Sequence, residues 1–175
     1  EYLEKYNKED ISLKIVDMGC GNCEDSIFFY DKNNIVFSID ENCNSNNSEL
    51  IIIKEDPEEV LFSKKLKTVF DVFYIKDFLN TLPHEKSQKI LDYSFKSLKS
   101  GGLICIETSS TVGKPYTIEK LSDFARKNDM EVLYCKEELF ENSLSIRCVF
   151  RKKNKDYYKG SPNYEFYRNV ILGVE

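Results

Sequence analysis

The chain has 175 residues, of which 41% are hydrophobic, so it is long enough and apolar enough to form one domain with a core. Its net charge is -5, with both signs mixed along the chain, so we expect no nucleic-acid partner, since binding phosphates requires a basic face. No apolar run approaches the roughly 18 to 20 residues that span a bilayer, and we expect neither a membrane span nor a signal peptide.

Strands and helices are predicted to alternate along the chain. Short apolar or β-branched runs predict five strands, over Lys14–Asp17, Ile35–Asp40, Leu50–Ile53, Phe70–Ile75 and Leu103–Glu107. Helical spacing and start signals predict helices between them, over Cys23–Tyr30, from Asp56-Pro57 onward, over Pro83–Lys99 and over Thr117–Lys127. The exception is the connection over residues 41–48, which is polar, rich in asparagine and has no helical period.

The inward sides of these helices follow from the same spacing. The helix over Pro83–Lys99 should end at Gly101-Gly102. Side chains expected to face the core are Ile27, Phe28 and Phe29 in the first helix, Ile90, Leu91, Phe95 and Leu98 in the third, and Leu121 and Phe124 in the fourth.

Strands separated by helices form a mostly parallel sheet that is covered on both faces. Two further strands are predicted at Glu131–Tyr134 and Ser145–Phe150, with no clear helix between them. Neighbouring strands joined in this way are antiparallel. The fold class is therefore α/β, with an antiparallel end to the sheet.

The turn after the first strand has the outline of a nucleotide-type cofactor site. Asp17-Met18-Gly19-Cys20-Gly21 takes the strand into a glycine-rich turn, and Asp40 ends the second strand nineteen positions after Gly21. In such sites glycines let the backbone approach the ligand, and the second acid accepts hydroxyl hydrogens from a ribose. A third glycine is usual, and Cys23 stands in its place.

The six cysteines allow several interpretations. Cys105, Cys135 and Cys148 lie in apolar strand patterns, and we expect buried free thiols there and a reducing, cytoplasmic location. Cys20 and Cys23 form a C-x-x-C, which fits a redox pair or, with Cys43, part of a zinc site. The glycines and Asp40 explain the segment better, so we expect no metal ligands.

Four segments in register resemble the class I S-adenosylmethionine-dependent methyltransferases, over residues 12–153. These segments are Asp17–Gly21, Asp40, Phe70-Asp71-Val72-Phe73-Tyr74 and Leu98-Lys99-Ser100-Gly101-Gly102-Leu103-Ile104. The resemblance implies a Rossmann-like, doubly wound, mostly parallel seven-stranded sheet with an antiparallel last strand, and S-adenosylmethionine as cofactor. It implies cofactor-binding roles for Asp17, Gly19, Cys20, Gly21, Asp40, Glu41, Asp56 and Tyr74. Asp56 is also a candidate helix cap, and both roles can hold together.

The acceptor is expected near the end of the fourth strand. Asp77 and Asn80 are the candidate catalytic residues, to orient or deprotonate an acceptor, and Lys76 is a candidate partner for an anionic group. The segment over residues 107–110 is a candidate lining of the acceptor pocket. The single histidine, His84, is expected on the surface.

A narrower resemblance concerns residues 74–82 and 141–147. They are similar to the "YSRFFLHSI" and "DDPVVIR" segments of small bacterial methyltransferases, which are often linked to surface-polysaccharide or small-metabolite modification. The resemblance implies methyl transfer to a small-molecule or saccharide acceptor. The alternative is a catalytically inactive methyltransferase-fold domain that binds a ligand or acts as a scaffold.

The domain organisation is expected to be a methyltransferase-like domain over residues 1–153 and a tyrosine-rich tail or linker over residues 154–175. Because the chain begins at Glu1, we also expect a neighbouring domain in a longer chain.

Overall fold

The fold is known from a computed structural model that describes residues 11–63, 68–110, 116–140 and 143–153. The predicted tail over residues 154–175 lies outside the described residues. The strands are β1 (Lys14–Met18), β2 (Ile35–Ile39), β3 (Ile51–Ile53), β4 (Phe70–Lys76), β5 (Leu98–Ser109), β6 (Met130–Phe140) and β7 (Ser143–Lys152). The helices are α2 (Glu24–Tyr30), α3 (Pro57–Phe62), the short 3-10 helix η1 (Leu79–Thr81), α4 (His84–Ser97) and α5 (Ile118–Lys127).

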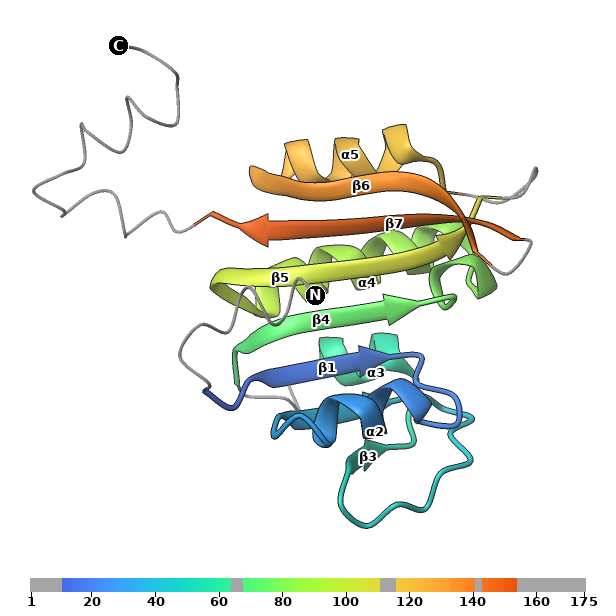
Figure 1. The fold of residues 1–175 in the computed structure, drawn as a ribbon, viewed down its shortest axis with the longest axis vertical. Helices are drawn as coiled ribbons and strands as arrows, with labels where there is room; N and C mark the ends of the chain where they lie inside the picture. Colours follow the sequence, from blue (N-terminus) through green and yellow to red (C-terminus); the bar gives the residue numbers. More distant parts are fainter. Residues whose placement is uncertain (1–10, 64–67, 111–115, 141–142, 154–175) are drawn as a thin grey trace, which may run out of the picture.

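The strands form one seven-stranded sheet in the order β3-β2-β1-β4-β5-β7-β6 (Figure 1). The first five are parallel to one another, whereas β7 is antiparallel to both β5 and β6. The predicted fold class is therefore confirmed. The carboxyl ends of β1, β2, β4 and β5 meet at one edge, where open α/β sheets bind their ligands.

Helices cover the two faces of the sheet unequally (Figure 1). On one face α2 packs over β1 and β2, where Phe29 joins a cluster with Ile15 and Val36. On the other face α3, α4 and α5 bury their apolar sides in the main core, together with the inward residues of the central strands. Of the predicted core positions, Ile90, Leu91, Leu98, Leu121 and Phe124 are buried.

Local signals position most of the helices correctly. Asp56 caps α3 by accepting a hydrogen bond from the amide of Glu58, and Thr117 caps α5 by accepting one from Lys120. The asparagine-rich connection between β2 and β3 contains no helix, as predicted. The prediction for Phe28 is wrong, because its side chain is 58% exposed while its neighbour Phe29 is buried.

The Gly101-Gly102 pair lies inside β5, not after a helix, because α4 ends at Ser97 and the strand begins at Leu98. The pairing with β4 is irregular here, since Phe70 faces Leu98 while Val72 faces Leu103. A β-carbon on Gly102 would stand 2.8 Å from the Asp71 carbonyl oxygen, so the backbones of these strands approach closely only with glycine at this position.

The prediction of free thiols at Cys135 and Cys148 is wrong, because the two residues form a disulfide. They lie directly opposite each other in the β6–β7 pairing, which the sequence of either strand alone does not reveal. Cys105 is a free thiol, as predicted, but it is half-buried and not fully buried. Of the three thiols that indicated a reducing compartment, only Cys105 is free. The cytoplasmic location stays a prediction.

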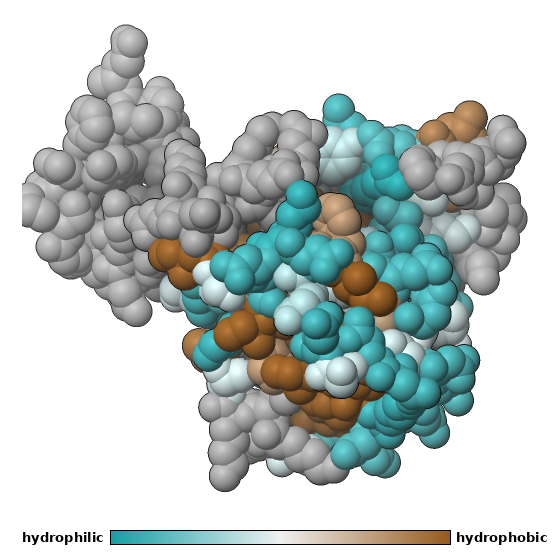
Figure 2. All heavy atoms as spheres, turned by 60° about the horizontal axis from the view of Figure 1, so that its bottom comes forward, coloured by the Kyte–Doolittle hydropathy of each residue, from teal (hydrophilic) through white to brown (hydrophobic). Residues whose placement is uncertain are grey.

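Figure 2 shows the surface at the β3 side of the sheet, where hydrophobic areas alternate with hydrophilic ones. Exposed apolar side chains near this edge include Ile51 on β3 and Ile35 on β2. None of the helices described here is long and apolar enough to cross a membrane.

Candidate functional site

The turn between β1 and α2 depends on two glycines with left-handed backbones. Gly19 has a φ of 75° and Gly21 a φ of 54°, a region that favours glycine because it lacks a β-carbon. A β-carbon on Gly19 would stand 2.6 Å from Cβ of Phe78 and closer still to its ring, whereas one on Gly21 would meet nothing within 4 Å. The turn is thus closed against Phe78 at Gly19 and open at Gly21.

Asp40 fastens this turn to the end of β2. One of its carboxylate oxygens accepts a hydrogen bond from the Gly21 amide at 3.0 Å, and the other accepts one from the Asn42 amide at 2.7 Å. The Gly19 amide donates to the Ile39 carbonyl oxygen at 2.8 Å, and the Cys20 amide points to the same oxygen at 3.4 Å. Each carboxylate oxygen has further lone pairs, so Asp40 is still able to accept hydroxyl hydrogens.

Asp17 lies beneath the turn in a buried polar network. Its carboxylate accepts a hydrogen bond from the Ser26 hydroxyl of α2 at 2.5 Å, and Ser26 accepts one from Ser38 of β2 at 2.8 Å. Burial raises the pKa of Asp17 to about 6, although the Ser26 hydrogen bond opposes the shift. Sequence analysis did not identify Ser26 and Ser38, whose only signal is a polar residue at an inward position.

Cys20 and Cys23 are buried on either side of Gly21. Cys23 precedes α2 with a φ of 67° and a ψ of 23°, so the position of the missing third glycine has a glycine-like backbone but carries a side chain. Burial raises the pKa of both thiols above the ordinary cysteine value. Both sulfurs therefore stay protonated near neutral pH.

The other predicted cofactor residues differ in their surroundings. Glu41 is exposed in the turn after Asp40. Asp56 caps α3 and forms an ion pair with Lys86; burial alone would raise its pKa, but the Lys86 hydrogen bond and the helix amides lower the pKa overall. Tyr74 pairs in register with Asp17, and its ring packs edge-on against Phe29 with centroids 5.0 Å apart.

The residues after β4 lie at the carboxyl edge of the sheet. The exposed Asp77 has a φ of 51°, and its amide donates to the Glu107 carbonyl oxygen at 2.9 Å. The Asn80 side-chain amide donates to the Ser109 carbonyl oxygen at 3.2 Å. Lys76 forms an ion pair with Asp25 of α2 at 3.1 Å, a partner that sequence analysis did not identify. His84 is exposed, as predicted.

Three buried polar atoms, one in η1 and two at or just after the end of β5, have no hydrogen-bond partner within the described part of the chain. These are Oδ1 of Asn80, Oγ1 of Thr108 and Oγ of Ser110. A buried oxygen without a partner costs about 1 to 3 kcal/mol, so such atoms in a folded protein call for an explanation. All three lie near the carboxyl end of β5, the region where the sequence predicts the acceptor.

No family model matches the chain, and no curated protein matches it in sequence. Among solved structures, the chain is similar to a 1,6-didemethyltoxoflavin-N1-methyltransferase from Burkholderia thailandensis, with bound 1,6-didemethyltoxoflavin and S-adenosylhomocysteine, at a TM-score of 0.69 and 12% identity. That match covers 82% of this chain and 72% of the other.

Two further solved structures show the same likeness. A SAM-dependent methyltransferase from Archaeoglobus fulgidus matches at a TM-score of 0.70 and 16% identity, over 86% of this chain and 90% of that one. A magnesium protoporphyrin IX methyltransferase from Synechocystis, with bound SAM, matches at a TM-score of 0.69 and 11% identity. That match covers 87% of this chain and 76% of the other. The chain therefore has the fold of the class I S-adenosylmethionine-dependent methyltransferases.

Proposed function

We propose that the protein is a methyltransferase that binds S-adenosylmethionine at the turns after β1 and β2 and methylates a small-molecule or saccharide acceptor beside β4 and β5. The observation that carries the proposal is the closure of the glycine turn on Asp40, through the 3.0 Å hydrogen bond from Gly21, at the carboxyl edge of a sheet with this strand order. We name residues 19–23 and 40–43 the donor loops, and residues 77–80 and 107–110 the acceptor end.

The residues of the donor loops fit this cofactor. The open space beside Gly21 admits a ligand against the backbone, and Asp40 is exposed enough to accept both hydroxyls of a ribose. Asp17 would attract the amino group and Glu41 would lie beside the ribose. Tyr74 would border the methionine part, and Asp56 the adenine. When bound, S-adenosylmethionine supplies a methyl group activated by a positively charged sulfur.

The acceptor end would position the nucleophile. Asn80 lies within hydrogen-bonding distance of the β5 terminus, and its oxygen has no partner in the described residues, so it is suited to receive a donor group from an acceptor. The exposed Asp77 is suited to take a proton. Alignment of nucleophile, carbon and sulfur supplies much of the rate in such transfers, so strong acid-base chemistry is not required.

Two of the similar solved structures are methyltransferases named for 1,6-didemethyltoxoflavin and magnesium protoporphyrin IX, which favours a small-molecule acceptor here. None of the three neighbours reported is described as a polysaccharide-modifying enzyme, so that narrower expectation gains no support. We further propose residues 1–153 as the methyltransferase unit.

The first test is cofactor binding by calorimetry. Replacement of Asp40 by alanine should weaken S-adenosylmethionine binding by roughly 1 to 3 kcal/mol, or about 5- to 150-fold, because charged hydrogen bonds to the ribose are lost. Glu49→Ala is the matched control, since Glu49 is an exposed acid in the connection between β2 and β3. Its affinity should equal that of the unmodified chain.

Thermal unfolding of both variants shows whether the fold is kept. Unchanged affinity in Asp40→Ala would refute the ribose assignment. No binding by the unmodified chain at millimolar S-adenosylmethionine would instead favour an inactive domain of the same fold, which serves as a scaffold or binds another ligand.

A further inference from the structure

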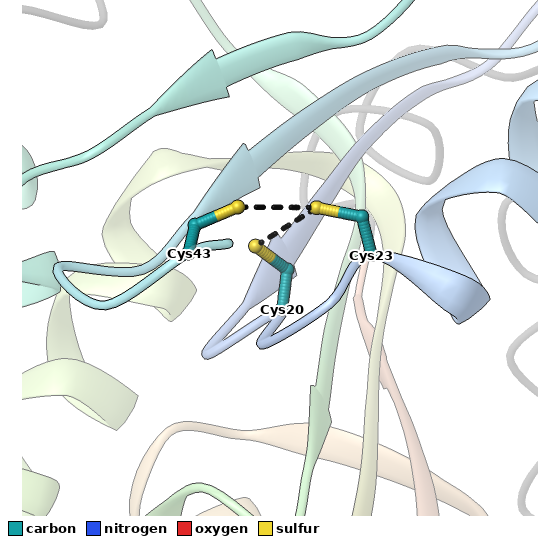
Figure 3. A group of neighbouring side chains, drawn as sticks. All are labelled: Cys20, Cys23 and Cys43. Carbon is teal, nitrogen blue, oxygen red and sulfur yellow. Dashed lines mark hydrogen bonds between the residues drawn. The ribbon is translucent and has the colours of Figure 1, made fainter. Parts of the chain in front are cut away.

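Three cysteine side chains converge between the donor loops (Figure 3). Cys20 and Cys23 come from the turn after β1, and Cys43 comes from the turn after β2. The Cys23 sulfur lies 3.5 Å from that of Cys20 and 3.4 Å from that of Cys43, and all three sulfurs lie within 4.8 Å of one another. Residues from two separate loops are thus brought to one point by the fold.

The cluster is enclosed by apolar side chains. Exposed fractions are 9% for Cys20, 0% for Cys23 and 5% for Cys43, and the three belong to the same buried group as Phe29 and Val36. Thiols form only weak hydrogen bonds, so three that face one another gain little from their mutual contacts. A buried apolar contact would be made as well by alanine or valine.

The backbone at Cys23 costs free energy. Its φ of 67° is in the left-handed region, where a residue with a β-carbon is disfavoured relative to glycine. A glycine, which is usual at this position of such turns, would remove this cost but would also remove the sulfur. Strain kept in place at one residue often accompanies a function of its side chain.

The spacing of the sulfurs suits a thiolate-bound metal ion. With zinc–sulfur bonds of about 2.3 Å, tetrahedral coordination separates two sulfurs by about 3.8 Å and trigonal coordination by about 4.0 Å. Two of the observed separations, 3.5 and 3.4 Å, are a few tenths of an ångström shorter, and all three lie within 4.8 Å, so small rotations of the side chains suffice. Thiolates are soft ligands that select zinc over magnesium or calcium.

We propose that Cys20, Cys23 and Cys43 form a three-thiolate site for a soft divalent metal ion, zinc first, with an exogenous ligand such as water in the fourth position. Binding breaks three S–H bonds, releases three protons to solvent and forms three S–Zn bonds, without any change of oxidation state. The ion would join the two donor loops close to the hydrogen bond between Gly21 and Asp40. The site shares the donor loops with the proposed cofactor, but zinc binding is measured without S-adenosylmethionine, so the failure of one proposal is distinguishable from the failure of the other.

The test uses the full chain under reducing conditions, with zinc measured by competition against a chromophoric chelator and with cobalt as a spectroscopic probe. We expect one ion per chain and a sulfur-to-cobalt charge-transfer band. Cys20→Ser, Cys23→Ser and Cys43→Ser should each weaken zinc binding by more than the roughly 10- to 100-fold that loss of an outer hydrogen-bond partner costs. Cys105→Ser is the matched control, because Cys105 is a free cysteine of β5 outside the cluster, and it should bind as the unmodified chain does.

A second measurement covers variants that do not fold. In the unmodified chain, zinc should protect the three cluster thiols from alkylation, as mapped by mass spectrometry, and leave Cys105 unprotected. Zinc should also raise the melting temperature, because it binds the native state. The proposal would be overturned if the chain bound less than one zinc ion. It would also be overturned if Cys105→Ser lost as much zinc affinity as the three cluster variants, or if a disulfide formed among the three cysteines in place of a bound ion.

Discussion

The donor loops and the acceptor end lie at the same edge of the sheet but satisfy their polar groups differently. In and below the donor loops, the Asp17 carboxylate, the Asp40 carboxylate and the Gly21 amide all have partners within the chain. At the acceptor end, buried oxygens of Asn80 and Thr108 have none among the described residues.

This difference indicates that the two regions have different requirements. The donor loops are organised by the sheet itself, through the register of β1 with β2 and the polar contacts below the turn. Under the proposed function, a cofactor would meet a site that is already shaped, which would lower the cost of binding. The acceptor end retains polar atoms that a bound acceptor would satisfy. Stability measurements on matched variants test whether this contrast is real.

The largest effect is expected from Gly19→Ala. The left-handed backbone at Gly19 would strain an alanine by about 1 to 2 kcal/mol. Its β-carbon would also clash with Cβ and the ring of Phe78, and such overpacking costs about 1 to 3 kcal/mol. The free energy of unfolding should therefore fall by about 2 to 5 kcal/mol. Gly21→Ala is the matched control and should cost only the strain, because its β-carbon would meet open space. Urea unfolding followed by circular dichroism measures both.

Equal costs for these two alanines would show that Phe78 gives way and that the turn is not closed at Gly19. Under the proposed function, Gly21→Ala should reduce cofactor affinity more than Gly19→Ala does, which is the reverse of their order in stability. A β-carbon on Gly21 would enter the space assigned to the cofactor, so Gly21→Ala should weaken S-adenosylmethionine binding by more than its cost in stability predicts.

The next effect depends on pH and concerns Asp17. Its folded pKa is raised from 3.8 to about 6, so the native state holds this proton more tightly than the unfolded chain does. The resulting stabilisation is fully present below pH 3.8 and is lost as pH rises through about 6. Asp17→Asn stays neutral throughout and is able to accept the Ser26 hydrogen bond. It should therefore gain about 2 to 3 kcal/mol over the unmodified chain between pH 4 and pH 7.

Urea unfolding of both proteins at pH 4 and at pH 7 isolates this contribution, since other titrating groups are common to the two. A difference that does not change with pH would mean that Asp17 has the same pKa in the folded and the unfolded chain, as a solvated carboxyl group does. A difference of the opposite sign would mean that Asp17 is paired with a cation. In either case burial would not be the factor that sets its pKa.

Much of the fold was accessible from the sequence because its signals are local. The Asp56-Pro57 helix start, the strand patterns and the glycine turn each depend on neighbouring residues. The pairing of Cys135 with Cys148 was missed because it depends on the register of two strands. Phe28 was misassigned because a helix of two turns leaves its inward side ambiguous by one residue.

The candidate site was predictable to a similar extent. The sequence identified Asp40 by its spacing from Gly21, but not that it holds the Gly21 amide. Nor does spacing show that Phe78, which follows β4 and precedes η1, closes against Gly19, or that Cys43 reaches Cys23. These contacts arise only once the parallel strands set the loops side by side, so they require the three-dimensional arrangement.

The smallest effect on stability is expected from Asn80→Ala. The change removes the hydrogen bond to the Ser109 carbonyl, worth about 0.5 to 1.5 kcal/mol, but also removes a buried oxygen whose missing partner costs about 1 to 3 kcal/mol. The two contributions oppose each other, so the free energy of unfolding should change by less than about 1 kcal/mol.

Ser26→Ala is the comparison for this variant on the donor side. It deprives the buried Asp17 of its hydrogen bond and leaves Ser38 without an acceptor, so it should cost about 1 to 3 kcal/mol in the same urea titration. If Asn80→Ala destabilises the protein as much as Ser26→Ala does, the Asn80 oxygen is already satisfied and the contrast between the two regions fails. If it does not, a small acceptor that raises the melting temperature of the unmodified chain but not of Asn80→Ala would show what that oxygen binds, because a ligand stabilises only the state that holds it.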